Sequence, residues 1–166
     1  MARSQPILFE DVFDVVDKDP DGKKFDSVSR FICHSDLYEM DLHIDLNTEL
    51  FPLQVRSLHY TTLLLLVKLT LRNDKFSLVL AWTLNLDATP GSEKYDAEFP
   101  AISGRRTLMD NYDYVMYGKV FKYKDNNMKV EVYISFGGLL MKLAGDPAKL
   151  EPIEVDSNIY LLLKKL

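Results

Sequence analysis

The sequence predicts an all-β protein whose antiparallel strands close into a barrel. Short segments with apolar residues at every second position recur along the chain, turn-forming residues separate them, and helical periodicity is scarce. We count about eight such segments, which favours a closed barrel because closure leaves no strand edge exposed. A length of 166 residues is compatible with a single domain over residues 1–166.

The N-terminal half holds three predicted strands. Residues Ile7–Val16 carry apolar side chains at alternate positions, interrupted only by Asp11. The turn-rich stretch Asp17–Lys24 separates this strand from the second, Phe25–His34. The third, Tyr38–Leu46, alternates most cleanly, with apolar Met40, Leu42, Ile44 and Leu46 opposite polar Glu39, Asp41, His43 and Asp45. This pattern predicts a half-buried antiparallel strand with one face in water.

Five further strands are predicted in the C-terminal half: Lys75–Leu84, Tyr112–Tyr123, Lys129–Phe136, Leu139–Ala144 and Ile159–Leu166. A loop of about residues 85–110 without a sustained period lies between the first two, and a loop of this length is normally functional or mobile. The segment Arg56–Arg72 also lacks alternation, since it is basic at its ends and apolar in the middle. Three interpretations of it stay open: an extra strand, a short buried helix or an insertion.

Composition argues against several classes of protein. A net charge of −5 disfavours a dedicated polyanion-binding domain, which would normally be strongly basic. Cys33 is the only cysteine, so no internal disulfide can form and a reducing compartment is expected. No signal-peptide pattern is visible, and the longest aliphatic run, Leu63–Val67, is far shorter than the roughly 20 residues of a membrane span. We therefore expect a soluble intracellular protein without membrane contact.

No pattern of residues indicates catalysis or a metal site. Asp17–Gly22 matches the start of a calcium loop, but the position that needs a bidentate glutamate holds Val28. Asp41, His43 and Asp45 share one strand face, where residues two apart are separated by roughly 6.6–6.8 Å, which is too far for a hydrogen-bonded triad. We therefore predict no cofactor and no metal. A carboxylate-based hydrolase would rest only on scattered acidic residues.

A weak nucleic-acid signal lies around the first turn. Single-strand binders combine positive charge with aromatic rings for base stacking, and this region contains Lys23, Lys24, Phe25, Arg30 and Phe31. The same stretch also contains Asp17, Asp19, Asp21 and Asp26, which oppose the positive charge. We expect at most weak, non-specific contact with single-stranded nucleic acid. A turn with solvated lysines is the alternative.

A glycine pair, Gly137-Gly138, stands inside the strand-forming run Ser135–Met141. Glycine has no side chain to pack and weakens a strand, so a pair usually marks a bulge, a sharp bend or a close approach by another backbone. No phosphate-loop pattern accompanies the pair, and a bend in a barrel strand is the simplest interpretation.

Several stretches of the chain match one known family. They are Ile7–Phe13, Asp19–Asp26, Tyr114–Val120, Ser135–Met141, Gly145–Pro147 and Tyr160–Leu166, which together span nearly the whole chain in the family's order. On these residues the chain resembles the small common subunit shared by the eukaryotic nuclear RNA polymerases I, II and III, the eighth subunit of the polymerase II series. Asn85-Leu86-Asp87, followed by a loop containing Pro-Gly, is most similar to plant members.

The resemblance implies a barrel related to the oligonucleotide/oligosaccharide-binding (OB) fold, with one long mobile loop. It also implies a non-catalytic subunit, located in the nucleus and nucleolus, that packs on the largest polymerase subunits. Such a subunit supports assembly and the transcription of rRNA, mRNA and small RNA genes. In the family, the stretch matching Asp19–Leu42 is associated with non-specific contact to single-stranded DNA. A free-standing single-stranded nucleic-acid-binding module of OB type is the alternative.

The resemblance also guides the expected docking residues, which are Tyr117, Gly118, Phe136, Gly137, Gly138 and Leu139. A flat glycine-rich edge lets a partner strand approach closely, although a simple bend of the barrel explains the glycines equally well. One departure concerns the segment Arg56–Arg72. Family members pass almost directly from Phe51-Pro52-Leu53 to Asp74-Lys75-Phe76, so we interpret this segment as an insertion, from a splice variant or gene model, that forms a projecting hairpin or helix.

Overall fold

The computed structural model describes residues 5–22, 25–55, 73–86, 106–126 and 128–166. These residues form strands β1 (Ile7–Lys18), β2 (Val28–Ser35), β3 (Met40–Asn47), β4 (Lys75–Ala81), β5 (Tyr114–Asp125), β6 (Val130–Phe136), β7 (Leu139–Gly145) and β8 (Asn158–Lys165). Two single helical turns, η2 (Leu108–Asn111) and α2 (Pro147–Leu150), accompany them. Lys23, Lys24, the segment Arg56–Arg72 and most of the loop of about residues 85–110 lie outside the described residues.

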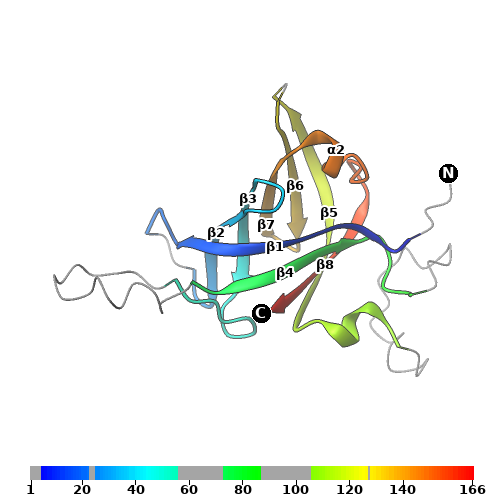
Figure 1. The fold of residues 1–166 in the computed structure, drawn as a ribbon. Helices are drawn as coiled ribbons and strands as arrows, with labels where there is room; N and C mark the ends of the chain where they lie inside the picture. Colours follow the sequence, from blue (N-terminus) through cyan, green and yellow to red (C-terminus); the bar gives the residue numbers. More distant parts are fainter. Residues whose placement is uncertain (1–4, 23–24, 56–72, 87–105, 127) are drawn as a thin grey trace, which may run out of the picture.

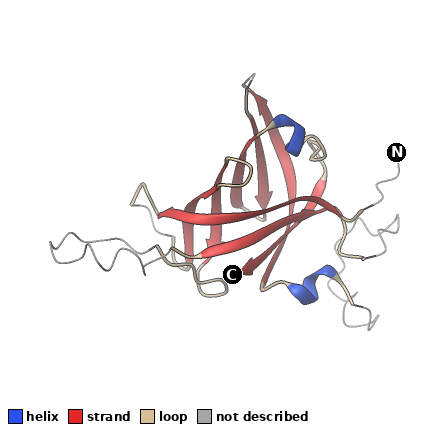
Figure 2. Ribbon diagram, viewed as in Figure 1, coloured by secondary structure: helices blue, strands red, loops and turns tan. Residues whose placement is uncertain are grey.

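The eight strands form one closed barrel in the order β1-β2-β3-β7-β6-β5-β8-β4, and every neighbouring pair is antiparallel (Figure 1). The near absence of helix among the described residues is evident in Figure 2. The predicted all-β antiparallel barrel is therefore confirmed, and its form is consistent with an OB-like barrel. The strand ends differ by a few residues from the prediction, since β2 begins at Val28 rather than Phe25 and β4 ends at Ala81 rather than Leu84.

Alternation along the strands fills the barrel with apolar side chains. On β3, Met40, Leu42, Ile44 and Leu46 are fully buried, as the sequence predicted. Phe13, Phe31 and Phe76 from β1, β2 and β4 are fully buried as well. Each such side chain contributes about 1.5–3 kcal/mol relative to an exposed one. The core is thus continuous across the strands that meet inside the barrel.

A second apolar cluster lies on the outer face of β4, β8 and β5. Its buried members are Val79, Ala81, Leu108, Tyr160 and Leu162. Leu108 comes from η2, which is fixed to the barrel by a hydrogen bond from the Leu108 amide to the Leu84 carbonyl at 2.9 Å. Strand β8 is therefore buried on both faces, which explains why Tyr160–Leu163 is a continuous apolar run rather than an alternating one.

The sequence predicts no segment long enough to span a membrane. None of the helices in the described ranges is long and apolar enough to cross a bilayer.

Candidate functional site

A cavity of about 540 Å³ lies between the β1–β2 connection and the β6–β7 hairpin. Its lining residues are Asp19, Pro20, Asp21, Phe25, Val28, Arg30, Asp45, Gly137, Gly138 and Leu139. The cavity therefore unites members of two predicted groups. Phe25 and Arg30 come from the nucleic-acid group, and the glycine pair with Leu139 comes from the docking group.

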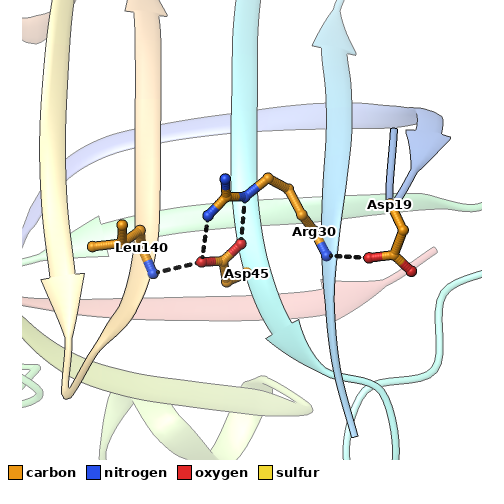
Figure 3. Close-up of polar contacts among 4 residues, drawn as sticks. All are labelled: Asp19, Arg30, Asp45 and Leu140. Atoms are coloured by element: carbon orange, nitrogen blue, oxygen red, sulfur yellow. Dashed lines mark hydrogen bonds and ion pairs between the residues drawn. The ribbon is translucent and has the colours of Figure 1, made fainter. Parts of the chain in front are cut away.

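A hydrogen-bonded network around Asp45 forms one wall of this cavity (Figure 3). The Arg30 guanidinium donates to both carboxylate oxygens, from Nε at 2.7 Å and from Nη2 at 2.9 Å. The Leu140 backbone amide on β7 donates to the same carboxylate at 3.1 Å. The sequence predicted Asp45 on the face in water, but its residue exposure is only 9% because these partners cover it. The hydrogen bond to Asp45 is the main cause that raises the pKa of Arg30.

The β1–β2 connection is held against β2 by Asp19. The Asp19 carboxylate accepts a hydrogen bond from the Arg30 amide at 2.9 Å, and the Asp19 amide donates to the Arg30 carbonyl at 2.8 Å. Asp19 and Gly22 both have positive φ angles, and the Gly22 amide donates to the Asp19 carbonyl at 2.8 Å. The residues Pro20, Asp21 and Gly22 thus form the tight turn that the sequence predicted. Among the residues that the structure describes, no group of three or more His, Cys, Asp or Glu side chains could hold a metal ion.

The glycine pair forms the turn of the β6–β7 hairpin. Gly137 and Gly138 have φ angles of +62° and +107°, and they alone separate the end of β6 from the start of β7. Two-residue hairpins favour type I′ turns, which need positive φ at both central positions. A Cβ atom at either glycine would meet nothing within 4 Å. The pair therefore makes a turn between two strands rather than a bend within one, and the space in front of it is open.

Gly118 has a different role from the hairpin glycines. A Cβ atom there would collide with the Ser135 carbonyl and would lie 2.5 Å from Cδ1 of Phe136. Phe136, only 5% exposed, packs directly against this position. Tyr117 lies on the outer face instead, where its ring is 4.8 Å from that of Tyr160. The six predicted docking residues thus fall in three places. Gly137, Gly138 and Leu139 line the cavity, Tyr117 belongs to the outer apolar cluster, and Gly118 packs against Phe136 in the barrel core.

The five predicted nucleic-acid residues do not form one surface in the described part of the chain. Phe31 is fully buried in the core, where its alternation with Cys33 on β2 already places it. Arg30 is engaged by Asp45, whereas Phe25 is 80% exposed. Lys23 and Lys24 fall outside the described residues. Of Phe25, Arg30 and Phe31, only Phe25 therefore has an exposed ring that could stack on a base.

The histidine on β2, His34, has a partner that sequence spacing does not reveal. His34 Nδ1 lies 2.9 Å from Asp41 Oδ1 on the neighbouring strand, so Asp41 pairs across the ladder rather than with His43. Burial, then Lys142 and Arg30, lower the pKa of His43. Cys33 is buried, and this burial raises the pKa of its thiol. A thiol so placed is a core side chain rather than a nucleophile.

Comparison with known proteins identifies the family. The family described as RNA polymerase Rpb8 matches residues 10–165, which include nearly every strand of the barrel. The chain belongs to the RNA polymerase Rpb8 family. A Dictyostelium discoideum relative named DNA-directed RNA polymerases I, II, and III subunit rpabc3 is 49% identical, with 96% of this chain and 97% of the relative covered.

Two further relatives in the Rpb8 family show how widely the likeness extends. The Arabidopsis thaliana protein named DNA-directed RNA polymerases II, IV and V subunit 8B is 44% identical, covering 98% of this chain and 99% of its own length. The Saccharomyces cerevisiae protein named DNA-directed RNA polymerases I, II, and III subunit RPABC3 is 33% identical, covering 95% and 97%. The resemblance inferred from the sequence motifs is confirmed by these matches, and a plant protein is among them.

Proposed function

We propose that this chain is a shared, non-catalytic subunit of the DNA-directed RNA polymerases I, II and III. The observation that carries the proposal is the match to the Rpb8 family over residues 10–165, together with 49% identity to a relative that is named as a subunit of all three enzymes. As a subunit it would act in the nucleus, including the nucleolus, in transcription of rRNA, mRNA and small RNA genes. The bond-making chemistry would belong to other subunits.

Affinity purification of the tagged full chain, followed by mass spectrometry, tests this assignment. We expect the largest subunits of polymerases I, II and III to be recovered together with the tagged chain. Recovery of only some of these enzymes would narrow the proposal to those enzymes. The plant relative, for example, is named as a subunit of polymerases II, IV and V. Recovery of none of them would overturn it. Tight, salt-sensitive binding of oligonucleotides by the isolated chain would then favour the free-standing nucleic-acid-binding alternative.

We further propose that the β6–β7 hairpin and its cavity dock on the largest polymerase subunit. The open space in front of Gly137 and Gly138 lets another backbone approach. Phe25 and Leu139 supply apolar surface at the same cavity, and Phe25 is 80% exposed. An exposed aromatic side chain beside a cavity is a typical anchor at protein interfaces.

Gly137→Asn separates docking from turn formation. Asn-Gly is a favoured type I′ sequence, and the φ of +62° at Gly137 suits asparagine, so stability should change by less than about 1 kcal/mol. The new side chain would occupy the open space, and we expect the variant to fold but to be recovered poorly with the polymerases. Gly22→Asn is the matched control, because Gly22 has a φ of +66°, equally open space and no place in the cavity lining. Full assembly of Gly137→Asn would exclude a backbone contact at the hairpin.

A further inference from the structure

The outer wall of β2, β3, β7, β6 and β5 carries a row of directly opposed residues. Ladder pairing aligns Ile32 with His43, His43 with Lys142, Lys142 with Tyr133, and Tyr133 with Lys122. Strands lie about 4.8 Å apart, so this row extends roughly 19 Å across the barrel wall. It contains cationic, aromatic and apolar side chains but no carboxylate.

The carboxylates on either side of the row are already engaged. Asp45 accepts from Arg30, and Asp41 lies 2.9 Å from His34 Nδ1 and 3.4 Å from Lys129 Nζ. Glu131 accepts a hydrogen bond from the Tyr133 hydroxyl at 2.7 Å. By contrast, neither Lys122 nor Lys142 forms an ion pair with any described carboxylate. The row therefore presents two lysines without an ion-pair partner among the described carboxylates, on a chain whose net charge is −5.

Apolar and aromatic side chains border these two lysines. The register shift between Val120 and Lys122 makes Phe121 an extra residue, and its ring, in a side chain 48% exposed, lies 6.2 Å from that of Tyr133. Lys122 Nζ lies 5.5 Å from the centre of the Tyr133 ring. Leu140, opposite Ser135 on the neighbouring row, is 43% exposed. The wall thus places two lysines beside exposed apolar and aromatic side chains, and aromatic residues are enriched at protein interfaces.

We propose that this wall, which we call the lysine row (Ile32, His43, Lys142, Tyr133 and Lys122), binds an acidic segment of a protein partner. The segment would place separate carboxylates at Lys142 and Lys122 and apolar side chains at Leu140 and Phe121. Isolated carboxylates can pair with these two lysines while avoiding Asp41, Asp45 and Glu131. A phosphodiester chain carries a charge at every nucleotide, so it would also place charges beside these three carboxylates, which would repel them.

The identification of the partner as another polymerase subunit rests on the proposed function, but the binding of an acidic segment can be tested without it. The probe is a short labelled peptide of repeated Glu-Ser-Glu-Leu, titrated by fluorescence anisotropy with the full chain. The same peptide with lysine in place of glutamate and an oligothymidylate serve as comparisons. We expect the acidic peptide to bind, with affinity falling between about 50 mM and about 200 mM salt because the contact is electrostatic.

Lys122→Glu/Lys142→Glu should weaken binding of the acidic peptide about ten-fold or more, as expected for charge reversal at two paired contacts. Lys149→Glu/Lys164→Glu is the matched control, since both lysines are exposed, lie outside the wall and give the same change in net charge. Far-UV circular dichroism and thermal melting verify that both variants fold. Tighter binding of oligothymidylate than of the acidic peptide at the same lysines would overturn the proposal, and so would equal binding by both variants.

The assembled enzyme provides a second, independent measurement. A zero-length carbodiimide cross-linker applied to purified polymerase should join Lys122 or Lys142 to an Asp or Glu of another subunit. Cross-links from other lysines of this chain, with none from these two, would overturn the inference within the complex. If the tagged chain recovers no polymerase at all, the proposed function fails, while the peptide titration still decides whether the lysine row binds acidic segments.

Discussion

Asp45→Asn should weaken the barrel at one of its two shortest strand pairings, the seam where β3 meets β7. These strands exchange only four residue pairs, from Asp41 with Ala144 to Ile44 with Met141. The Asp45 carboxylate extends the seam by accepting the Leu140 amide, and it also accepts two bonds from Arg30. In asparagine, an NH₂ group replaces one of the two carboxylate oxygens, and this group donates hydrogen bonds and cannot accept them. At least one of the three donors therefore loses its partner.

The expected loss follows from the exposure of the partners. A buried donor left unsatisfied costs about 1–3 kcal/mol, and the Asp45 side chain is only 12% exposed. The Arg30 side chain is 44% exposed, so water can replace the carboxylate there, and we assign about 1 kcal/mol to this pair. We expect a total loss of about 2 kcal/mol, equivalent to a decrease in Tm of roughly 4–8 °C for a domain of this size.

A double-mutant cycle with Arg30→Met separates the two parts of this loss. Urea denaturation can be followed by the fluorescence of Trp82, the only tryptophan in the chain. Asp45→Asn should cost more than Arg30→Met, because the Leu140 contact does not involve Arg30, and the two changes should couple by about 1 kcal/mol. If both single variants cost the same and their effects add fully, Asp45 neither pairs with Arg30 nor secures the seam.

Two further predictions concern Gly118 and His43. Gly118→Ala should lower stability by about 1–3 kcal/mol, since its Cβ would collide with the Ser135 carbonyl and the Phe136 ring; an unchanged thermal melting curve would contradict this. His43 has a lowered pKa in the folded chain, chiefly through burial and then Lys142, so folding disfavours its protonated form. Its contribution to stability is present above the unfolded pKa of about 6.5 and is lost as pH falls toward the folded pKa. Stability should therefore decline more steeply in the wild type than in His43→Gln between about pH 7.5 and about pH 5, and equal slopes in urea denaturation would refute this.

The barrel was predictable because strand alternation is a local signal. On β3, each second residue from Met40 to Leu46 is buried, and the sequence alone shows that pattern. The double burial of β8 was not predictable in the same way. Its outer residues Tyr160 and Leu162 are covered by Leu108 of η2, which lies about fifty residues earlier in the chain. A continuous apolar run does not say which distant segment covers it.

The candidate site was predictable only in part, since its contacts cross between strands. The burial of Asp45 depends on Arg30 and Leu140, which spacing along β3 does not indicate. For Phe31 the signal was present: its alternation with Cys33 on β2 places the ring in the core, although its basic neighbours suggested stacking on a base. The lysine row was not predicted, because its members come from five strands that only the barrel order aligns.

The pair of Arg30 and Asp45 belongs to two surfaces at once. It lines the cavity at the β6–β7 hairpin, and it also lies beside the lysine row, where Asp45 accepts a hydrogen bond from the Leu140 amide. A substitution at either residue would change the charge of both surfaces and the stability of the seam between them. Loss of assembly in such a variant could not be assigned to one surface. Gly137→Asn and Lys122→Glu/Lys142→Glu avoid this ambiguity, because the first alters only the hairpin turn and the second only the outer wall.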